Sequence, residues 1–321
     1  MKTLIFGAGP IGQWLAMRLG DAARDVTLLA RGATLANLRA NGVIMVDGFT
    51  GEKRTARVSL VDHISQTDSY DLVIVPMRKS SRIDVCRTLA EHRNLENILF
   101  LGNDVSGFHR YLDILPKEKV LLGFPSAGGG IDGQDLVFAD QDNPNGKRRP
   151  IYVGELSGEI TERMKRIQSL FEAAGIPVSL EKNIDGWLKY HFAFVGPIAG
   201  AVVKCNNDVR AVGTNKKVLH QFVLACREAG NVLRKAGYPK RQPPIFNLFY
   251  WTPLWLAPKA FKPLFDSRFT EVAIGLHLNA IGNEFAQMAD ELSELQAKAG
   301  IDTPNLDELL GHIPREQETN G

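Results

Sequence analysis

The chain has few cysteines and no large excess of charge of either sign. Its three cysteines, Cys86, Cys205 and Cys226, are scattered over 321 residues, a spacing that argues against a disulfide framework and a zinc-binding motif. The formal net charge is +2, so no extended cationic surface for nucleic acid is expected. The basic run Lys147-Arg148-Arg149 follows a polar turn and is typical of a solvated loop. We therefore expect neither a metal ion nor a nucleic acid as a ligand.

No uninterrupted apolar segment is long enough to cross a membrane. The longest apolar stretch, 245–265, is interrupted by two lysines and by Pro253, Pro258 and Pro263, so a membrane span is not expected. An apolar run begins within the first few residues and leaves no room for a signal peptide. We predict a cytoplasmic protein without a membrane partner. The aromatic stretch 245–265 leaves three roles open: a pocket wall, an oligomer interface or ordinary core, and a homodimer is left open with it.

A glycine turn opens the chain directly after an apolar run. Leu4-Ile5-Phe6 is followed by Gly7-Ala8-Gly9-Pro10-Ile11-Gly12 and then by an amphipathic helical pattern. In such a turn the first glycine permits the tight bend, the second lets backbone approach a pyrophosphate, and the third lets the helix pack on the sheet. The N-terminus of the helix attracts phosphate. Gly7, Gly9, Pro10, Ile11 and Gly12 are therefore predicted to bind a dinucleotide.

The acidic residue that binds the ribose hydroxyls of NAD is missing. The second apolar run, Val26 to Ala30, ends at Arg31, where an NAD site usually carries Asp or Glu. A cation at this point suits the 2′-phosphate of NADP. We therefore predict NADP(H) as the cofactor; a solvated surface arginine is the alternative.

The pattern of apolar runs divides the chain in two. Short runs alternate with helical stretches up to about residue 181, which predicts a Rossmann-type, doubly wound α/β sheet in residues 1–181. Within it, 136–139 and 151–153 are expected to form an antiparallel hairpin, and 128–130 a flexible glycine bend. Helical spacing dominates afterwards, so residues 182–321 are predicted to form an all-helical substrate and catalytic domain.

Polar residues follow the ends of the predicted strands, where ligands bind in open α/β sheets. Lys79 and Asn103 stand just past two strands, and an asparagine there offers both a donor and an acceptor to a nicotinamide amide or a substrate. The alternatives are a solvated lysine and a turn residue. Lys189 lies among aromatic residues, and partial desolvation suits a lysine to proton donation near neutral pH. Its alternative is an ammonium that reaches water past a buried stem.

A helical stretch near the C-terminus carries further polar residues. His277 and Glu284 are seven positions apart and share one helix face. Asn279 falls toward the opposite side. A solvated polar face is the alternative interpretation.

These residues together resemble the ketopantoate reductase (2-dehydropantoate 2-reductase) family over nearly the whole chain. The specific marks are the glycine turn with Arg31, Lys79, Gly102-Asn103, Trp187-Leu188-Lys189, and Asn283-Glu284 ahead of the run 299–304. The resemblance implies that Lys189 is the general acid, that Glu284 hydrogen-bonds near the reacting centre, and that Asn103 lies at the junction of cofactor and substrate.

The chain departs from the family in the residues that hold the substrate. The asparagines usual after the lysine are absent from the stretch 190–197, and the usual Ser-Ser-Met-like run is absent from 271–279. His191 and His277 are proposed replacements, and Asn279 is a weaker one. The expected activity is NADPH-dependent reduction of a 2-oxo acid to a 2-hydroxy acid, with 2-dehydropantoate as the leading substrate. The alternatives are a non-catalytic NADP(H) sensor and an opine- or hydroxyacid-type dehydrogenase with another substrate.

Overall fold

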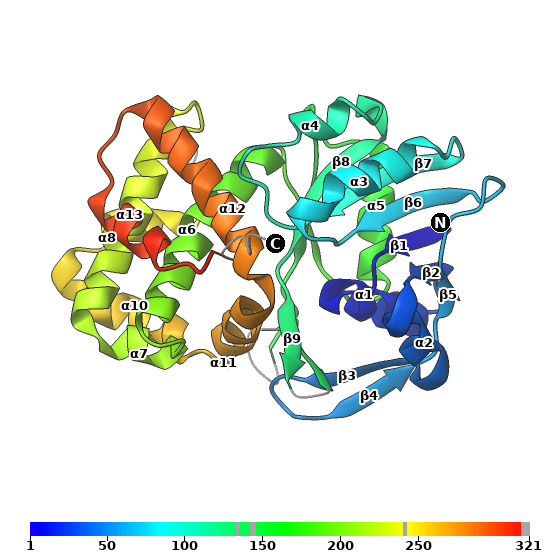
Figure 1. Ribbon diagram of the computed structural model, residues 1–321, viewed down its shortest axis with the longest axis horizontal. Coiled ribbons are helices and arrows are strands. Elements are labelled where there is room, and N and C mark those ends of the chain that lie inside the picture. Colours follow the sequence, from blue (N-terminus) through cyan, green and yellow to red (C-terminus); the bar gives the residue numbers. More distant parts are fainter. Residues whose placement is uncertain (133–134, 142–145, 240–242, 316–321) are drawn as a thin grey trace, which may run out of the picture. The chain divides into compact units, whose positions relative to one another are not determined.

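The computed structural model describes residues 1–132, 135–141, 146–239 and 243–315, apart from the side chains of 276–283. The chain forms two compact units (Figure 1). The α/β unit comprises residues 1–102 and 107–185, and the helical unit comprises residues 103–106 and 186–321. The α/β class with a helical C-terminal region, predicted from the sequence, is confirmed.

The α/β unit is built on an eight-stranded sheet of order β12-β11-β8-β7-β6-β1-β2-β5. Its strands are β1 (Thr3–Phe6), β2 (Val26–Leu29), β5 (Ser59–Val61), β6 (Tyr70–Val75), β7 (Leu95–Leu101), β8 (Val120–Pro125), β11 (Ile151–Glu155) and β12 (Val178–Leu180). Neighbouring strands are parallel except for the pair β8–β11. The strand order reverses at β1, which lies between β2 and β6. Ligands bind beside such a switch point in doubly wound sheets.

A second, four-stranded sheet of order β4-β3-β10-β9 belongs to the same unit (Figure 1). It consists of β3 (Val43–Asp47), β4 (Lys53–Ala56), β9 (Gly128–Asp132) and β10 (Asp135–Ala139). Two expectations are wrong here. The glycine bend is strand β9. The strands 136–139 and 151–153 do not pair, because β10 pairs with β9 and β3 while β11 pairs with β8 and β12. Of the expected hairpin, the described residues retain an isolated antiparallel bridge between Gln141 and Arg148. A Cβ on Gly129 would lie 2.1 Å from the Val137 carbonyl oxygen, so glycine serves close strand pairing at this position.

Helices complete the α/β unit. They are α1 (Pro10–Asp21), α2 (Gly32–Asn41), α3 (Lys79–Ala90), α4 (His109–Leu112), the 3-10 turn η1 (Lys117–Lys119) and α5 (Glu162–Glu172). The central strands are fully buried, as Ile5, Leu28, Ile74 and Leu99 illustrate, and they form one core with the inner faces of the helices. The near-continuous apolar runs that predicted these strands thus reflect burial on both faces.

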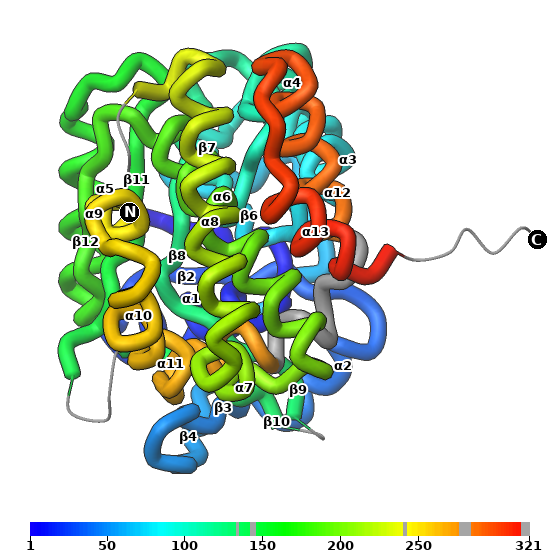
Figure 2. Tube along the Cα trace, turned by 90° about the vertical axis from the view of Figure 1, so that its left-hand side faces the viewer, coloured from blue at the N-terminus to red at the C-terminus, as the bar shows by residue number. Residues whose placement is uncertain are grey.

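The helical unit contains no strand among its described residues. Its elements are α6 (Ile184–Lys204), α7 (Val209–Thr214), α8 (Lys216–Lys235), α9 (Phe246–Trp251), η2 (Leu254–Leu256), α10 (Ala257–Asp266), α11 (Arg268–Thr270), the π turn Glu271–Gly275, α12 (Leu276–Ala299) and α13 (Pro304–Gly311) (Figure 2). The apolar stripe of α8, which includes Leu219, Phe222, Val223 and Cys226, is buried as its spacing predicts. Among the described residues, none of the helices has the length and apolar character that crossing a membrane requires.

Candidate functional site

The backbone of the glycine turn has the tight bend, the open space and the close approach that the sequence predicts for its three glycines. Gly7 has φ +120°, which L side chains rarely adopt, and a Cβ on Gly12 would lie 2.0 Å from the Gly7 carbonyl oxygen. Among the described residues, no atom beyond its chain neighbours approaches within 4 Å of the place a Gly9 Cβ would take. Gly9 is the N-cap of α1, with Pro10 at the first helical position. The backbone therefore leaves open space at a helix N-terminus, as a pyrophosphate requires.

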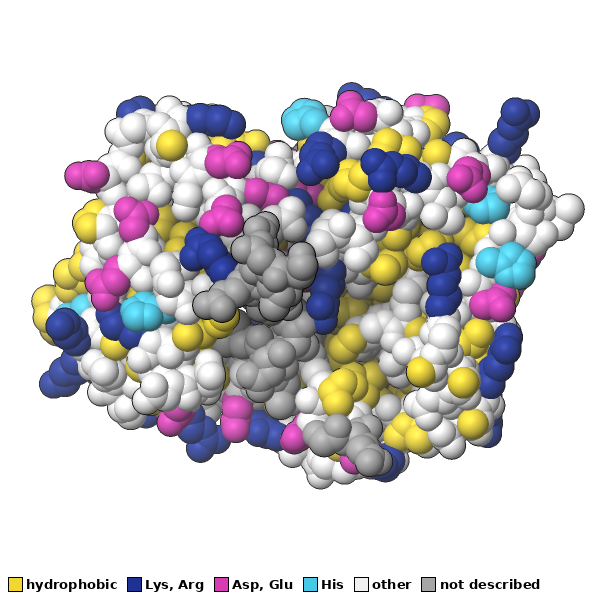
Figure 3. Space-filling view, viewed as in Figure 1, with side chains coloured by type: hydrophobic (Ala, Val, Ile, Leu, Met, Phe, Trp, Pro, Cys, Tyr) yellow, Lys and Arg dark blue, Asp and Glu magenta, His cyan; other side chains and the backbone are white. Residues whose placement is uncertain are grey.

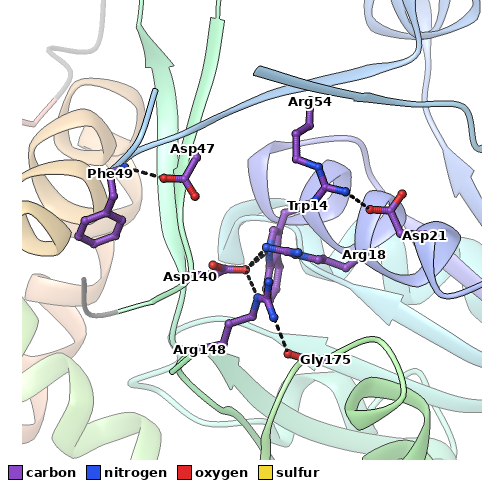
Figure 4. Close-up of polar contacts among 9 residues, drawn as sticks. All are labelled: Trp14, Arg18, Asp21, Asp47, Phe49, Arg54, Asp140, Arg148 and Gly175. Carbon is purple, nitrogen blue, oxygen red and sulfur yellow. Dashed lines mark hydrogen bonds and ion pairs between the residues drawn. The ribbon is translucent and has the colours of Figure 1, made fainter. Parts of the chain in front are cut away.

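A buried carboxylate fastens helix α1 to the second sheet (Figure 4). Asp140 follows β10, and its Oδ2 accepts hydrogen bonds from Trp14 Nε1 at 3.0 Å, Arg18 Nη2 at 2.8 Å and Arg148 Nε at 3.2 Å. The Trp14 ring also stacks on Phe138, with ring centroids 5.2 Å apart. Because Trp14 and Arg18 both belong to α1, this cluster holds the helix whose N-terminus carries the glycine turn.

Arg31 lies at the carboxyl end of β2, next to the glycine turn. Leu29, two residues earlier, pairs with Phe6, which directly precedes Gly7. The Arg31 side chain is exposed, and its Nε donates a hydrogen bond to the Asp62 carbonyl oxygen at 3.2 Å. This bond holds the guanidinium at the sheet edge while the group stays accessible to a ligand from solvent.

Lys79 is the first residue of α3, after the end of β6. Its side chain is only 8% exposed, so the alternative of a solvated lysine is wrong. The preceding residue, Arg78, is exposed. The sequence analysis did not single out Arg78, although it stands at the same strand end and presents a cation to solvent.

Arg82 is a fully buried residue of α3 that joins two strand ends. Its Nε donates to the Met77 carbonyl oxygen at 3.0 Å and its Nη2 to the Leu101 carbonyl oxygen at 3.1 Å, while Nη1 lies 3.4 Å from the Tyr111 hydroxyl. A Cβ on Gly102, where φ is +139°, would lie 2.3 Å from Arg82 Nη2. The glycine before Asn103 thus makes room for this guanidinium. Sequence reasoning missed Arg82, and Gly102 was the available signal.

Asn103 and His191 come together in the helical unit from positions 88 residues apart. The His191 Nδ1 lies 2.8 Å from the Asn103 Oδ1. With the amide oxygen as acceptor, Nδ1 carries the proton. The indole of Trp187 stacks on the imidazole, with centroids 5.1 Å apart and planes at 8°. The two residues that the sequence assigned to cofactor and substrate contacts are therefore one hydrogen-bonded pair.

The short segment 103–106 is held in the helical unit by further contacts. Val105 is fully buried in its core, and the Ser106 amide donates to the Glu291 Oε2 at 3.0 Å. Gln287 donates to the other oxygen of the same carboxylate at 3.2 Å. Sequence reasoning missed Glu291, because nothing local distinguishes it from a solvated helix residue.

Lys189 is buried, with 3% of its surface exposed. Its ammonium lies 4.9 Å from the centroid of the Tyr238 ring, a cation–π distance. Tyr190 fixes that neighbourhood by donating from its hydroxyl to the Tyr238 carbonyl oxygen at 2.8 Å. The alternative interpretation, in which the Lys189 ammonium reaches water past a buried stem, is therefore wrong.

Helix α12 carries the remaining predicted residues. Glu284 is half-buried. The side chains of His277 and Asn279 lie outside the described residues, so their predicted substrate contacts stay predictions.

Two of the three cysteines are buried. Burial raises the pKa of the Cys86 thiol to about 12 and also raises the pKa of Cys226, so both are protonated thiols, not nucleophilic thiolates. No group of His, Cys, Asp and Glu that could hold a metal occurs in the described part of the chain. On the face shown in Figure 3, acidic and basic side chains are interspersed.

Comparisons with known proteins agree with this arrangement. Residues 3–156 match the family model described as ketopantoate reductase PanE/ApbA. The chain is 28% identical over 212 residues to a 2-dehydropantoate 2-reductase of Mesorhizobium japonicum, a match covering 59% of this chain and 63% of that protein.

Solved structures share the fold over nearly the whole chain. A ternary structure of D-mandelate dehydrogenase with NADH and anilino(oxo)acetate has a TM-score of 0.74 at 15% identity and covers 98% of this chain and 97% of its own. A 2-dehydropantoate 2-reductase from Geobacter metallireducens has a TM-score of 0.72 at 16% identity, with 98% and 99% covered. At such identities the likeness concerns the fold alone. The family match therefore assigns residues 3–156 to a ketopantoate reductase domain, and low identity to the oxidoreductases named above is consistent with a divergent relative.

Proposed function

We propose that this oxidoreductase uses NADPH to reduce a 2-oxo acid to a 2-hydroxy acid, with 2-dehydropantoate as the leading substrate. The observation that carries the proposal is the exposed Arg31 guanidinium at the end of β2, beside a glycine turn with open space at Gly9. Gly7, Gly9, Pro10, Ile11 and Gly12 would hold the pyrophosphate against the N-terminus of α1. Arg31 would pair with the 2′-phosphate, and Lys79 or its exposed neighbour Arg78 would supply a further cation.

The proton would come from the helical unit. A bound nicotinamide cofactor supplies a hydride to the carbonyl carbon. The carbonyl oxygen then needs a proton, and Lys189 would donate it from its ammonium, leaving a neutral amine that solvent reprotonates. Glu284 would orient Lys189 or the substrate hydroxyl. Burial and the contact with the Tyr238 ring support this role, because they hold the Lys189 side chain in a defined position.

The substrate's polar end would be held by Asn103 and His191. Their hydrogen bond orients the Asn103 amide. The pair would take over the role of the asparagines that the sequence lacks after Lys189. Trp187 stacks on His191 and adds a flat apolar surface. That aromatic surface favours a second candidate, an aryl 2-oxo acid, as in the D-mandelate dehydrogenase of similar fold.

A substrate panel tests the proposal. The purified protein is mixed with NADPH or NADH and with 2-dehydropantoate, phenylglyoxylate or simple aliphatic 2-oxo acids, and cofactor oxidation is followed. Oxidation of NADPH by at least one 2-oxo acid supports the proposal. NADPH binding without turnover on every acid would instead favour a non-catalytic sensor. Turnover that appears only when an amino acid is added to the 2-oxo acid, so that an imine can form, would favour an opine-type dehydrogenase.

Replacing Arg31 with alanine is expected to weaken NADPH binding by roughly tenfold to a hundredfold, the range of one charge-assisted hydrogen-bonded contact. NADH, which has no 2′-phosphate, should bind almost as before. Dissociation constants from fluorescence titration give both values. The control is Arg87→Ala, because Arg87 is an exposed arginine of α3 paired with Asp84. Equal losses for NADPH and NADH would refute the 2′-phosphate assignment.

Replacing His191 with alanine removes the partner of the Asn103 amide oxygen. We expect the KM for the 2-oxo acid to rise roughly fivefold, since one hydrogen bond contributes about 1 kcal/mol, while the dissociation constant of NADPH stays unchanged. Steady-state kinetics with both ligands varied gives the two numbers. His220→Ala is the matched control, because His220 is also a half-buried histidine of the helical unit. Unchanged KM in the His191 variant would contradict a substrate-positioning role.

A further inference from the structure

Helix α9, turn η2 and helix α10 divide their aromatic residues between two faces. Phe246, Phe249, Phe261 and Phe265 are at most 4% exposed and belong to the core of the helical unit. Phe249 and Phe261 stack with centroids 4.8 Å apart. Both tryptophans of the segment point the other way. The sequence left three roles open for this stretch, namely a pocket wall, an oligomer interface and ordinary core. The phenylalanines belong to the core.

The outer face of α9 is also apolar. Ile245, Leu248 and Trp251 follow at three-residue spacing and are 43%, 44% and 71% exposed, and Trp255 in η2 is 78% exposed. A surface helix normally carries polar residues on its outer face. Contiguous exposed apolar residues of this kind mark an interaction surface. We call the residues Ile245, Leu248, Trp251 and Trp255 the outer apolar face.

Hydrogen bonds join the end of α9 to α8, beside which it lies (Figure 2). Arg227 of α8 donates from Nε to the Phe249 carbonyl oxygen at 2.6 Å and from Nη2 to the Thr252 carbonyl oxygen at 2.5 Å. The Tyr250 hydroxyl donates back to the Arg227 carbonyl oxygen at 2.7 Å. Because these bonds close the end of α9, the tryptophans are presented from an ordered element, and little conformational entropy is lost when they bind.

The stretch of sequence that carries the outer apolar face is basic. Between Glu228 and Asp266 the sequence contains no Asp or Glu. The same stretch contains six basic residues: Arg234, Lys235, Lys240, Arg241, Lys259 and Lys262. In α10, Lys259 and Lys262 are exposed, opposite the buried Phe261 and Phe265. Lys262 pairs with Asp266 at the end of α10, with Nζ and Oδ2 2.5 Å apart, and Lys259 lies one turn earlier. Exposed tryptophans beside such lysines are the pattern of a segment that lies in the interface of an anionic membrane.

We propose that the outer apolar face docks the protein peripherally on an anionic lipid bilayer, with Trp251 and Trp255 entering the headgroup region and Lys259 and Lys262 facing lipid phosphates. The prolines of this stretch exclude a membrane-spanning helix, but binding at the membrane surface does not require one. A second copy of the chain fits less well, because a two-fold interface would bring the same cationic surface against itself. The proposal does not depend on the reductase activity.

The tryptophans themselves provide the readout. The chain has four, and the other two, Trp14 and Trp187, are 1% and 2% exposed. The full-length protein is mixed with vesicles of phosphatidylcholine alone or with phosphatidylglycerol, and binding is measured by co-sedimentation. Vesicles with brominated acyl chains then test whether the exposed tryptophans reach the bilayer. We expect binding and quenching only with the anionic vesicles, both weakened by salt.

Two double variants separate the apolar and the charged contributions. Trp251→Ser with Trp255→Ser should abolish quenching and lower the partition coefficient by roughly tenfold or more, because the aromatic anchors are lost. Lys259→Glu with Lys262→Glu should lower it by roughly tenfold or more for anionic vesicles only. All four residues are exposed, so the thermal unfolding midpoint should stay unchanged.

Three results would overturn the proposal. The first is co-sedimentation of the protein to the same extent with neutral and anionic vesicles, or with neither. The second is binding that both double variants retain. The third is a stable dimer, measured by analytical ultracentrifugation without lipid, that the double tryptophan variant dissociates, which would assign the outer apolar face to a second copy.

Discussion

Replacing Lys189 with methionine is expected to lower kcat for the 2-oxo acid by roughly 10²- to 10⁴-fold, the usual contribution of a positioned general acid. Methionine keeps an unbranched apolar stem of similar length, so packing against the surrounding core changes little. The alkoxide that forms on hydride addition would have no proton donor beside it. NADPH affinity should stay the same, because Lys189 is assigned no contact with the cofactor.

Single-turnover kinetics at saturating NADPH measure this loss directly. Lys204→Met is the matched control, since Lys204 lies on the same helix α6 and its ammonium pairs with Gln221 and Glu308. That variant should keep its turnover. Lys189→Arg should remain slow, because a guanidinium does not give up its proton near neutral pH. Wild-type turnover in Lys189→Met would remove Lys189 from the mechanism.

Replacing Asp140 with alanine is expected to lower the free energy of unfolding by about 3 kcal/mol, the lower end for breaking a buried ion pair. Asp140 is 6% exposed at its side chain, while its partners Arg18 and Arg148 are 19% and 33% exposed. Partial exposure lets water screen the two arginines, so the effect stays below the upper limit. The variant would also leave Trp14 Nε1 without its acceptor.

Chemical denaturation followed by circular dichroism gives this value. Asp84→Ala is the control. The side chains of Asp84 and Arg87 are 79% and 66% exposed, so their ion pair should contribute less than about 1 kcal/mol. The Asp140 variant should also bind NADPH more weakly, since the cluster holds α1. If both variants lowered the free energy of unfolding equally, the Asp140 cluster would contribute no more to stability than an exposed ion pair.

The central strands of the main sheet were predictable because they are buried on both faces. The runs 72–75 and 98–101 are wholly apolar, and they are followed by a proline and a glycine, respectively. The second sheet was not predictable by the same argument. Strand β4 is the polar, exposed run Lys-Arg-Thr-Ala, and β9 begins with three glycines, so neither shows the alternation or the apolar run of a typical strand.

The candidate site was predictable where local geometry decides, and not where distant segments meet. The glycine turn needs only its own backbone, and the structure has the predicted strain and close approach at Gly7 and Gly12. The pairing of Asn103 with His191 depends on how segment 103–106 lies on the helical unit, which no local spacing encodes. Arg82 and Glu291 were missed for the same reason, because a charged residue of a helix is recognised as structural only from the groups it contacts.

Transfer of deuterium from cofactor to product tests the central claim most directly. The protein is incubated with NADPH carrying deuterium at the transferred C4 position, separately prepared in each stereochemical form, together with the 2-oxo acid panel. The products are analysed by mass spectrometry. We predict a 2-hydroxy acid that is one mass unit heavier with one of the two forms. Tight binding of NADPH with no deuterated product from any acid would contradict a reductase and leave a protein that only binds the cofactor.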